Sequence, residues 1–109
     1  MKADGDGLSY YLISDTKTHV LGVAHVHPSF KGRIHTHKEP ERYLLLKGQG
    51  ILFLDGRTSV LREGDVKHIP GNSAHAFVST GDTAVLMFEF DSGPLSSIEY
   101  TYTGQNIRS

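Results

Sequence analysis

The sequence predicts a single all-β domain, folded as an antiparallel β-sandwich or barrel. Short stretches rich in Val, Ile, Leu, Phe, Tyr and Thr recur along the chain, and these residues favour the pleated surface of a strand. Gly, Pro, Asn and Asp separate the stretches at short, even intervals, as in sandwiches and barrels. No window of ten residues has apolar side chains at helical spacing, and 109 residues suffice for one hydrophobic core.

The first half of the chain has five expected strands. They follow a Gly-rich, acidic N-terminus that we expect to be flexible over residues 1–7, and they lie at 8–14, 19–27, 33–37, 41–47 and 50–55. Pro28 ends the second strand. Pro40 favours a break before the fourth, because proline cannot donate a ladder hydrogen bond.

The second half continues the pattern, with strands expected at 58–62, 66–69, 75–80, 83–90 and 97–102. Asp55-Gly56 predicts a two-residue hairpin, since both turn positions need a positive φ. The later strands are separated by Glu63-Gly64-Asp65, Pro70-Gly71-Asn72, Gly81-Asp82 and Ser92-Gly93-Pro94. Residues 8–109 are therefore expected to form one β domain.

The composition excludes several classes of function. The chain has no cysteine, which rules out disulfides, thiol nucleophiles and thiolate metal sites. Eleven Lys and Arg balance twelve Asp and Glu, so no excess of positive charge favours nucleic acid or anionic membranes as partners. The apolar runs are too short to span a membrane, and the N-terminus lacks the features of a signal peptide. We therefore expect a cytoplasmic protein.

Two segments are apolar on both faces, at 44–46 and 51–54. One face of such a strand meets the interior, and the other must meet a second layer or another subunit. This pattern predicts a homodimer.

The segment from His35 to Glu41 carries the clearest chemical signal. His35 and His37 are two residues apart, so on a strand they project from the same face. Glu41 begins the strand that follows Pro40, close to both imidazoles. Two imidazole nitrogens and one carboxylate suit a borderline divalent metal such as Fe, Mn, Ni, Co, Cu or Zn.

A second pair of histidines, His25 and His27, shows that the spacing alone is not specific, so the neighbouring residues must decide. Gly48 follows Glu41 after six residues, and the second half carries Gly64, Pro70 and His75 at matching intervals. This pattern resembles the two motifs of the cupin superfamily, G(X)5HXH(X)3–4E(X)6G and G(X)5PXG(X)2H(X)3N. The chain departs from them at three positions, which hold Ser29, Asn72 and Ser79 in place of Gly, Gly and Asn.

The resemblance implies a jelly-roll barrel with one divalent transition metal ion inside, held by His35, His37, Glu41 and His75. Four protein ligands would leave one or two coordination positions open for water and substrate, which is typical of a catalytic site. The net charge of such a centre would favour an anionic or enolate-like substrate oxygen.

Three further residues are candidates for catalysis. Tyr43 shares the face of Glu41 and could offer a phenol to the substrate, or it could be an ordinary core aromatic residue. His25 lines the cavity if the face shared with His19 looks inward; if the small residues of that strand look inward, it faces solvent. His68 precedes Pro70 and could line the cavity or lie on the surface.

The resemblance leaves several activities open, because one fold and one ligand set serve many chemistries. We expect a metal-dependent dioxygenase, isomerase or lyase acting on a small oxygenated, enolisable or anionic substrate. The alternatives are a non-catalytic module that binds or senses a small ligand, and a structural or storage role.

Overall fold

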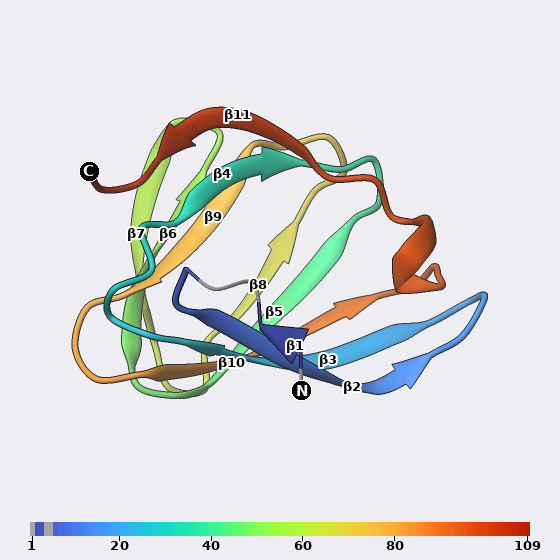
Figure 1. The fold of residues 1–109 in the computed structure, drawn as a ribbon, viewed down its shortest axis with the longest axis horizontal. Helices are drawn as coiled ribbons and strands as arrows, with labels where there is room; N and C mark the ends of the chain where they lie inside the picture. The colour runs from blue at the N-terminus through green and yellow to red at the C-terminus, as the bar shows by residue number, and fades with distance from the viewer. Residues whose placement is uncertain (1, 4–5) are drawn as a thin grey trace.

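The protein consists of two antiparallel β-sheets that face each other around a central space (Figure 1). The structure is a computed structural model and describes residues 2, 3 and 6–109. One sheet has the strand order β1-β2-β3-β10-β5-β8, and the other has the order β11-β4-β9-β6-β7. This arrangement confirms the predicted β-sandwich.

The strand boundaries follow the turn signals closely. The strands are β1 (Lys2–Ala3), β2 (Leu8–Asp15), β3 (Val20–Val26), β4 (Arg33–Thr36), β5 (Glu41–Lys47), β6 (Gln49–Leu54), β7 (Arg57–Arg62), β8 (Val66–Ile69), β9 (His75–Ser79), β10 (Ala84–Phe90) and β11 (Thr101–Asn106). The predicted hairpin is present between β6 and β7, where Asp55 and Gly56 have φ angles of 47° and 85°.

Both ends of the chain differ from the expectation. The boundaries of the strand expected at 97–102 are wrong. A 3-10 turn, η1 (Leu95–Ser97), follows Pro94, and β11 therefore begins only at Thr101. Residues 2 and 3 pair with β2, within the segment expected to be flexible. Residues 1, 4 and 5 lie outside the described residues, so the flexible N-terminus stays a prediction.

The inner faces of the two sheets form the core. The largest fully buried side chains include Leu45 of β5, Leu52 of β6 and Phe90 of β10. Gly22 of β3 lies under Phe88, because a Cβ atom at that position would overlap the Phe88 ring. This close contact turns the small residues of β3 inward and the alternate side chains of β3 outward.

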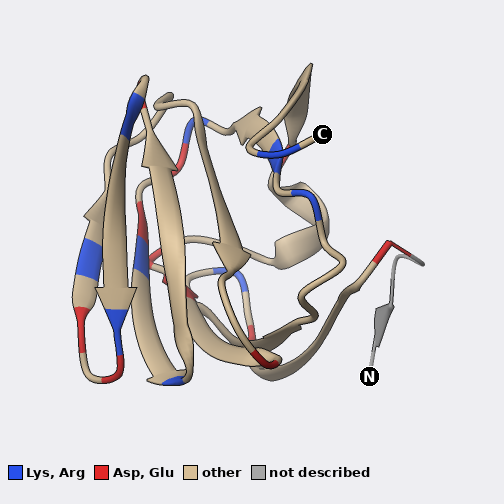
Figure 2. Cartoon of the chain, turned by 90° about the vertical axis from the view of Figure 1, so that its left-hand side faces the viewer, with Lys and Arg blue, Asp and Glu red and all other residues tan. Residues whose placement is uncertain are grey.

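The outer face of the six-stranded sheet exposes apolar side chains, including those of Tyr11, Ile13, Leu46 and Val66. The expected homodimer stays a prediction. Acidic and basic residues lie interspersed along the strands and turns (Figure 2). Within the described residues, no helix is long and apolar enough to cross a membrane.

Candidate metal centre

Three histidines from different parts of the chain meet inside the sandwich. His35 lies on β4, His37 follows the end of that strand, and His75 begins β9. The pairing of β4 with β9 places His35 directly opposite His75. The ring centroid of His75 lies 4.4 Å from that of His35 and 4.7 Å from that of His37. One ring nitrogen from each histidine lies within 4.8 Å of the other two, which suits a bound metal ion.

The backbone sets the protonation of all three rings. The Nδ1 atom of each ring lies within hydrogen-bond distance of a main-chain carbonyl oxygen, and a carbonyl can only accept, so Nδ1 carries the proton. The accepting oxygens belong to Arg33, Glu39 and Ser73, at 2.8, 2.8 and 2.9 Å respectively. In the neutral rings, Nε2 therefore keeps a free lone pair. Among the described residues, Nε2 of His75 is buried and has no hydrogen-bond partner.

Glu41 completes the cluster from the first position of β5. Its Oε1 atom lies 3.1 Å from Nε2 of His37 and 3.3 Å from Nε2 of His75, and all three side chains are almost fully buried. Burial alone would raise the pKa of Glu41, but the hydrogen bond with His37 and the nearby imidazole of His75 outweigh burial and lower it. The same carboxylate raises the pKa of His37 against the effect of burial. Without a cation, Glu41 and His37 form a buried ion pair.

The imidazole of His35 is held neutral. Burial, followed by the nearby His75, lowers the pKa of His35 to about 4. When all three imidazoles are neutral, three nitrogen lone pairs and one carboxylate oxygen gather in one buried space, and a bound cation can satisfy all of them. This donor set fits a borderline divalent metal ion.

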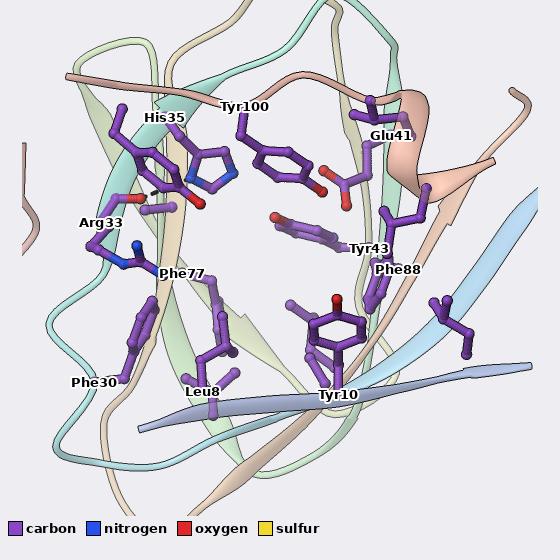
Figure 3. A pocket seen from close by; sticks show the side chains of 18 of the residues that line it. Leu8, Tyr10, Phe30, Arg33, His35, Glu41, Tyr43, Phe77, Phe88 and Tyr100 are labelled. Atoms are coloured by element: carbon purple, nitrogen blue, oxygen red, sulfur yellow. Dashed lines mark hydrogen bonds between the residues drawn. The ribbon is translucent and has the colours of Figure 1, made fainter. Parts of the chain in front are cut away.

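A cavity of about 640 Å³ lies beside this cluster, with His35 and Glu41 in its wall (Figure 3). Most of the wall is apolar or aromatic. Its rings come from Tyr10, Phe30, Tyr43, Phe77, Phe88, Tyr100 and Tyr102. A cavity of this size and character suits a small organic ligand.

Tyr43 lies in this wall, two residues after Glu41 on the same face of β5. Its ring meets that of His75 edge to face, with centroids 6.2 Å apart. Burial, and then the charge of Glu41, raise the pKa of the phenol well above its usual value. Its hydroxyl makes no hydrogen bond to any described residue and faces the cavity (Figure 3). The catalytic role expected for Tyr43 stays a prediction.

The two other catalytic candidates lie outside the cavity. His25 is on the outer face of β3, because Ala24 and Val26 take the inner positions and line the cavity. His68 is exposed on the edge strand β8, opposite Arg42. Of the alternatives left open by the sequence, the structure therefore has both histidines outside the cavity wall, and a catalytic role for either stays an untested prediction. From the sequence, either face of β3 could have been the inner one. The packing of Phe88 against Gly22 decides between the two orientations.

The cavity wall also contains two tyrosines that were not predicted from the sequence, Tyr10 and Tyr100. Tyr100 lies between η1 and β11, with its ring centroid 5.1 Å from that of His37 and 5.3 Å from that of His35. Tyr10 shares the inner face of β2 with Leu8 and Leu12, so alternation along that strand could have found it. No comparable signal exists for Tyr100, which follows an irregular segment.

Comparisons with known proteins agree with this geometry. The family profile described as a cupin domain matches residues 22–91. Dimethylsulfoniopropionate lyase DddW of Ruegeria pomeroyi is 37% identical over 84 residues, which cover 77% of this chain and 55% of the relative. An uncharacterized protein of Aquifex aeolicus is 37% identical over 57 residues, 51% of this chain and 47% of that protein. The chain spans about half the length of these curated relatives.

Solved structures share the fold at low identity. A RmlC-like cupin from Shewanella frigidimarina superposes with a TM-score of 0.80 at 19% identity, covering 87% of this chain and 85% of that one. Salicylate 1,2-dioxygenase from Pseudoaminobacter salicylatoxidans, in adducts with gentisate, gives 0.82 at 16% identity, covering 96% of this chain and 31% of that one. Two facing antiparallel sheets, a buried cluster of three histidines and a matching profile over most of the chain lead to one conclusion: this protein belongs to the cupin family.

Proposed function

We propose that this protein is a metal-dependent lyase that eliminates a leaving group from a small carboxylic acid. His35, His37, Glu41 and His75 would hold one divalent transition metal ion, such as Fe, Mn, Ni, Co, Cu or Zn. The observation that carries the proposal is the hydroxyl of Tyr43, which faces the cavity beside these four donors and has no partner among the described residues.

In this proposal, the four donors hold the metal ion and Tyr43 transfers the proton. A divalent cation held by the four donors would supply positive charge, which would polarise a bound carboxylate and favour the ionised phenol of Tyr43. The Oη atom of Tyr43 accepts the proton from the carbon next to the carboxylate. The pair of electrons from that C–H bond forms the carbon–carbon double bond, and the bond to the leaving group breaks with its electrons on the leaving group. The apolar wall excludes water from this step.

The relative named dimethylsulfoniopropionate lyase supports this reaction class, at 37% identity over 84 residues. The substrate in that name has a carboxylate at one end and a dimethylsulfonium group at the other. Its elimination would release dimethyl sulfide and leave acrylate. The aromatic rings of the cavity suit such a cation, because a ring face attracts positive charge. Dimethylsulfoniopropionate is therefore the first substrate to test.

The experiment begins with protein stripped by chelator and reloaded separately with each of the six metals. Dimethyl sulfide is measured in the headspace by gas chromatography, and acrylate by proton NMR. The variant Tyr43→Phe is expected to lower kcat by about 10² to 10⁴, the usual range for loss of a general base. Its metal content and melting temperature should stay at wild-type values, since the ring is kept.

The matched control is Tyr11→Phe, which removes an exposed hydroxyl on the outer face of β2 and should leave the rate unchanged. Full activity of Tyr43→Phe would remove Tyr43 from the mechanism. Metal binding without release of dimethyl sulfide or acrylate would contradict this substrate.

A further inference from the structure

A row of apolar side chains crosses the outer face of the six-stranded sheet. This apolar row has one member on each of five neighbouring strands, and each member is the register partner of the next: Tyr11, Val23, Met87, Leu44 and Val66. The side chains point away from the cavity, because the residues that alternate with them on β2, β3, β10 and β5 line it. A sheet face that meets only water normally carries polar residues. The apolar row therefore indicates that another surface covers this face.

Two bulges add further apolar side chains to the same face. The register of β2 with β3 skips Ile13, and the register of β10 with β5 skips Leu46. Together with Tyr11 and Val66, these two make up four of the seven large apolar or aromatic side chains that are exposed among the described residues. Only Val60 of those seven lies on the outer face of the five-stranded sheet. Of the two outer faces, the six-stranded sheet therefore has more apolar surface to cover.

The charged side chains beside the apolar row are paired within one copy of the chain. Nε2 of His19 lies 2.6 Å from Oε2 of Glu89. The guanidinium of Arg42 lies 2.9 Å from Glu89 and 2.8 Å from Asp91. An uncharged centre with a polar rim is the usual anatomy of a protein interface, and a rim that is already paired leaves no charge buried alone when a second surface approaches. The two carboxylates also disfavour an anionic membrane as the cover.

The size of this face suits a second copy of the chain. Five strands span about 24 Å across the sheet, and β3, β5 and β10, with seven residues each, extend for about 23 Å. One copy thus offers about 550 Å², and two copies together would bury about 1,100 Å². This area reaches the lower limit of about 1,000 Å² for a specific interface.

We propose that two copies of this protein associate through their apolar rows, sheet against sheet, as a homodimer with two-fold symmetry. Such a pair buries the same face on both copies. Met87 is the middle member of the row, so the two Met87 side chains lie close to the two-fold axis. This inference does not rest on the proposed lyase activity.

Sedimentation velocity of the protein, at concentrations from about 1 to 100 μM, tests the association. The modest area predicts a dimer with a Kd of about micromolar order. The variant Val66→Lys changes a side chain that is 65% exposed, so the fold should be kept. It should weaken association by about tenfold, because the ammonium group would lose water without gaining a partner. Tyr11→Lys, at the other end of the row, should act in the same way, and the double variant should be monomeric.

The matched control is Val60→Lys, which introduces the same charge at an exposed valine of the other sheet and should leave the Kd unchanged. Cross-linking gives a readout that does not depend on the introduced charges. Because the chain has no cysteine, Met87→Cys supplies a unique thiol. A short bis-maleimide should join two copies through that thiol, since packed sheets lie about 10 Å apart, whereas Val60→Cys should not be joined.

A monomer at the highest concentration would overturn the inference. So would a dimer that Val60→Lys dissociates and Val66→Lys does not, because the interface would then lie on the other sheet. A dimer without cross-linking at Met87→Cys would also refute this interface, and open-ended growth into larger assemblies would contradict a two-fold pair. None of these measurements involves release of dimethyl sulfide, so the two proposals fail separately.

Discussion

Replacing His37 by Ala tests the buried pair at the centre of the site. In the metal-free protein, this change leaves the Glu41 carboxylate buried with Nε2 of His75 at 3.3 Å as its remaining contact in the cluster. The side chains of His37 and Glu41 are 0% and 5% exposed, so the pair is shielded from bulk solvent. Removal of one partner from a buried ion pair costs about 3–5 kcal/mol in free energy of unfolding. For a domain of this size, the melting temperature should fall by roughly 12–20 °C.

A double-mutant cycle separates the loss of the pair from the loss of packing. The variant Glu41→Gln keeps the shape of the side chain and removes its charge. We expect the double variant to recover about 1–3 kcal/mol relative to the sum of the single changes. Urea unfolding in chelator, followed by circular dichroism, measures all four proteins. The control is His27→Ala. His27 is exposed and hydrogen-bonded to Ser29, so this change should alter the free energy of unfolding by less than about 0.5 kcal/mol.

Metal content, measured by plasma emission, gives a second readout of the same variants. His37→Ala should lose the metal, because one of the three imidazoles is gone. Glu41→Gln should retain more, because the amide oxygen can still coordinate. One metal ion per subunit in His37→Ala would refute the ligand assignment, and strictly additive unfolding energies would refute the buried pair.

Two further predictions concern the scaffold. Gly50→Ala should destabilise the protein by about 1–3 kcal/mol, because a Cβ atom at this position would overlap a carbonyl oxygen of β9. The control is Gly81→Ala, where a Cβ atom meets open space, and this change should be nearly neutral in thermal unfolding. On the outer face, hydrogen bonds from His19 and then Arg42 lower the pKa of Glu89, so its contribution is present at neutral pH and lost as pH falls. Glu89→Gln should therefore cost up to about 1 kcal/mol at pH 7, and the difference from wild type should shrink below about pH 4.3; a constant difference would contradict the pair.

Three of the four donors could be predicted because His35, His37 and Glu41 lie within seven residues of sequence, whereas His75 was expected only from the resemblance to the second cupin motif. His35 and His37 share a face by strand geometry, and Pro40 sets the start of β5 at Glu41. Strand spacing and turn residues also placed nearly every strand boundary within one residue. These features depend on local backbone preferences, which short segments of sequence express directly.

The orientation of β3 could not be predicted in the same way. His19 and His25 alternate with small apolar residues, and either face of that strand could have looked inward. The ring of Phe88, on β10, requires the absence of a side chain at Gly22 and so turns His25 outward. This contact joins strands that are far apart in the chain.

The sequence by itself determined a β-sandwich, its turns and a nitrogen and oxygen donor set for a metal. Only the tertiary structure decided what surrounds that set: the phenols of Tyr10 and Tyr100 and the pairing of Arg33 with Asp6. The reason is physical. Strands and turns follow from interactions between near neighbours, whereas the wall of a cavity is assembled by packing between segments from both ends of the chain.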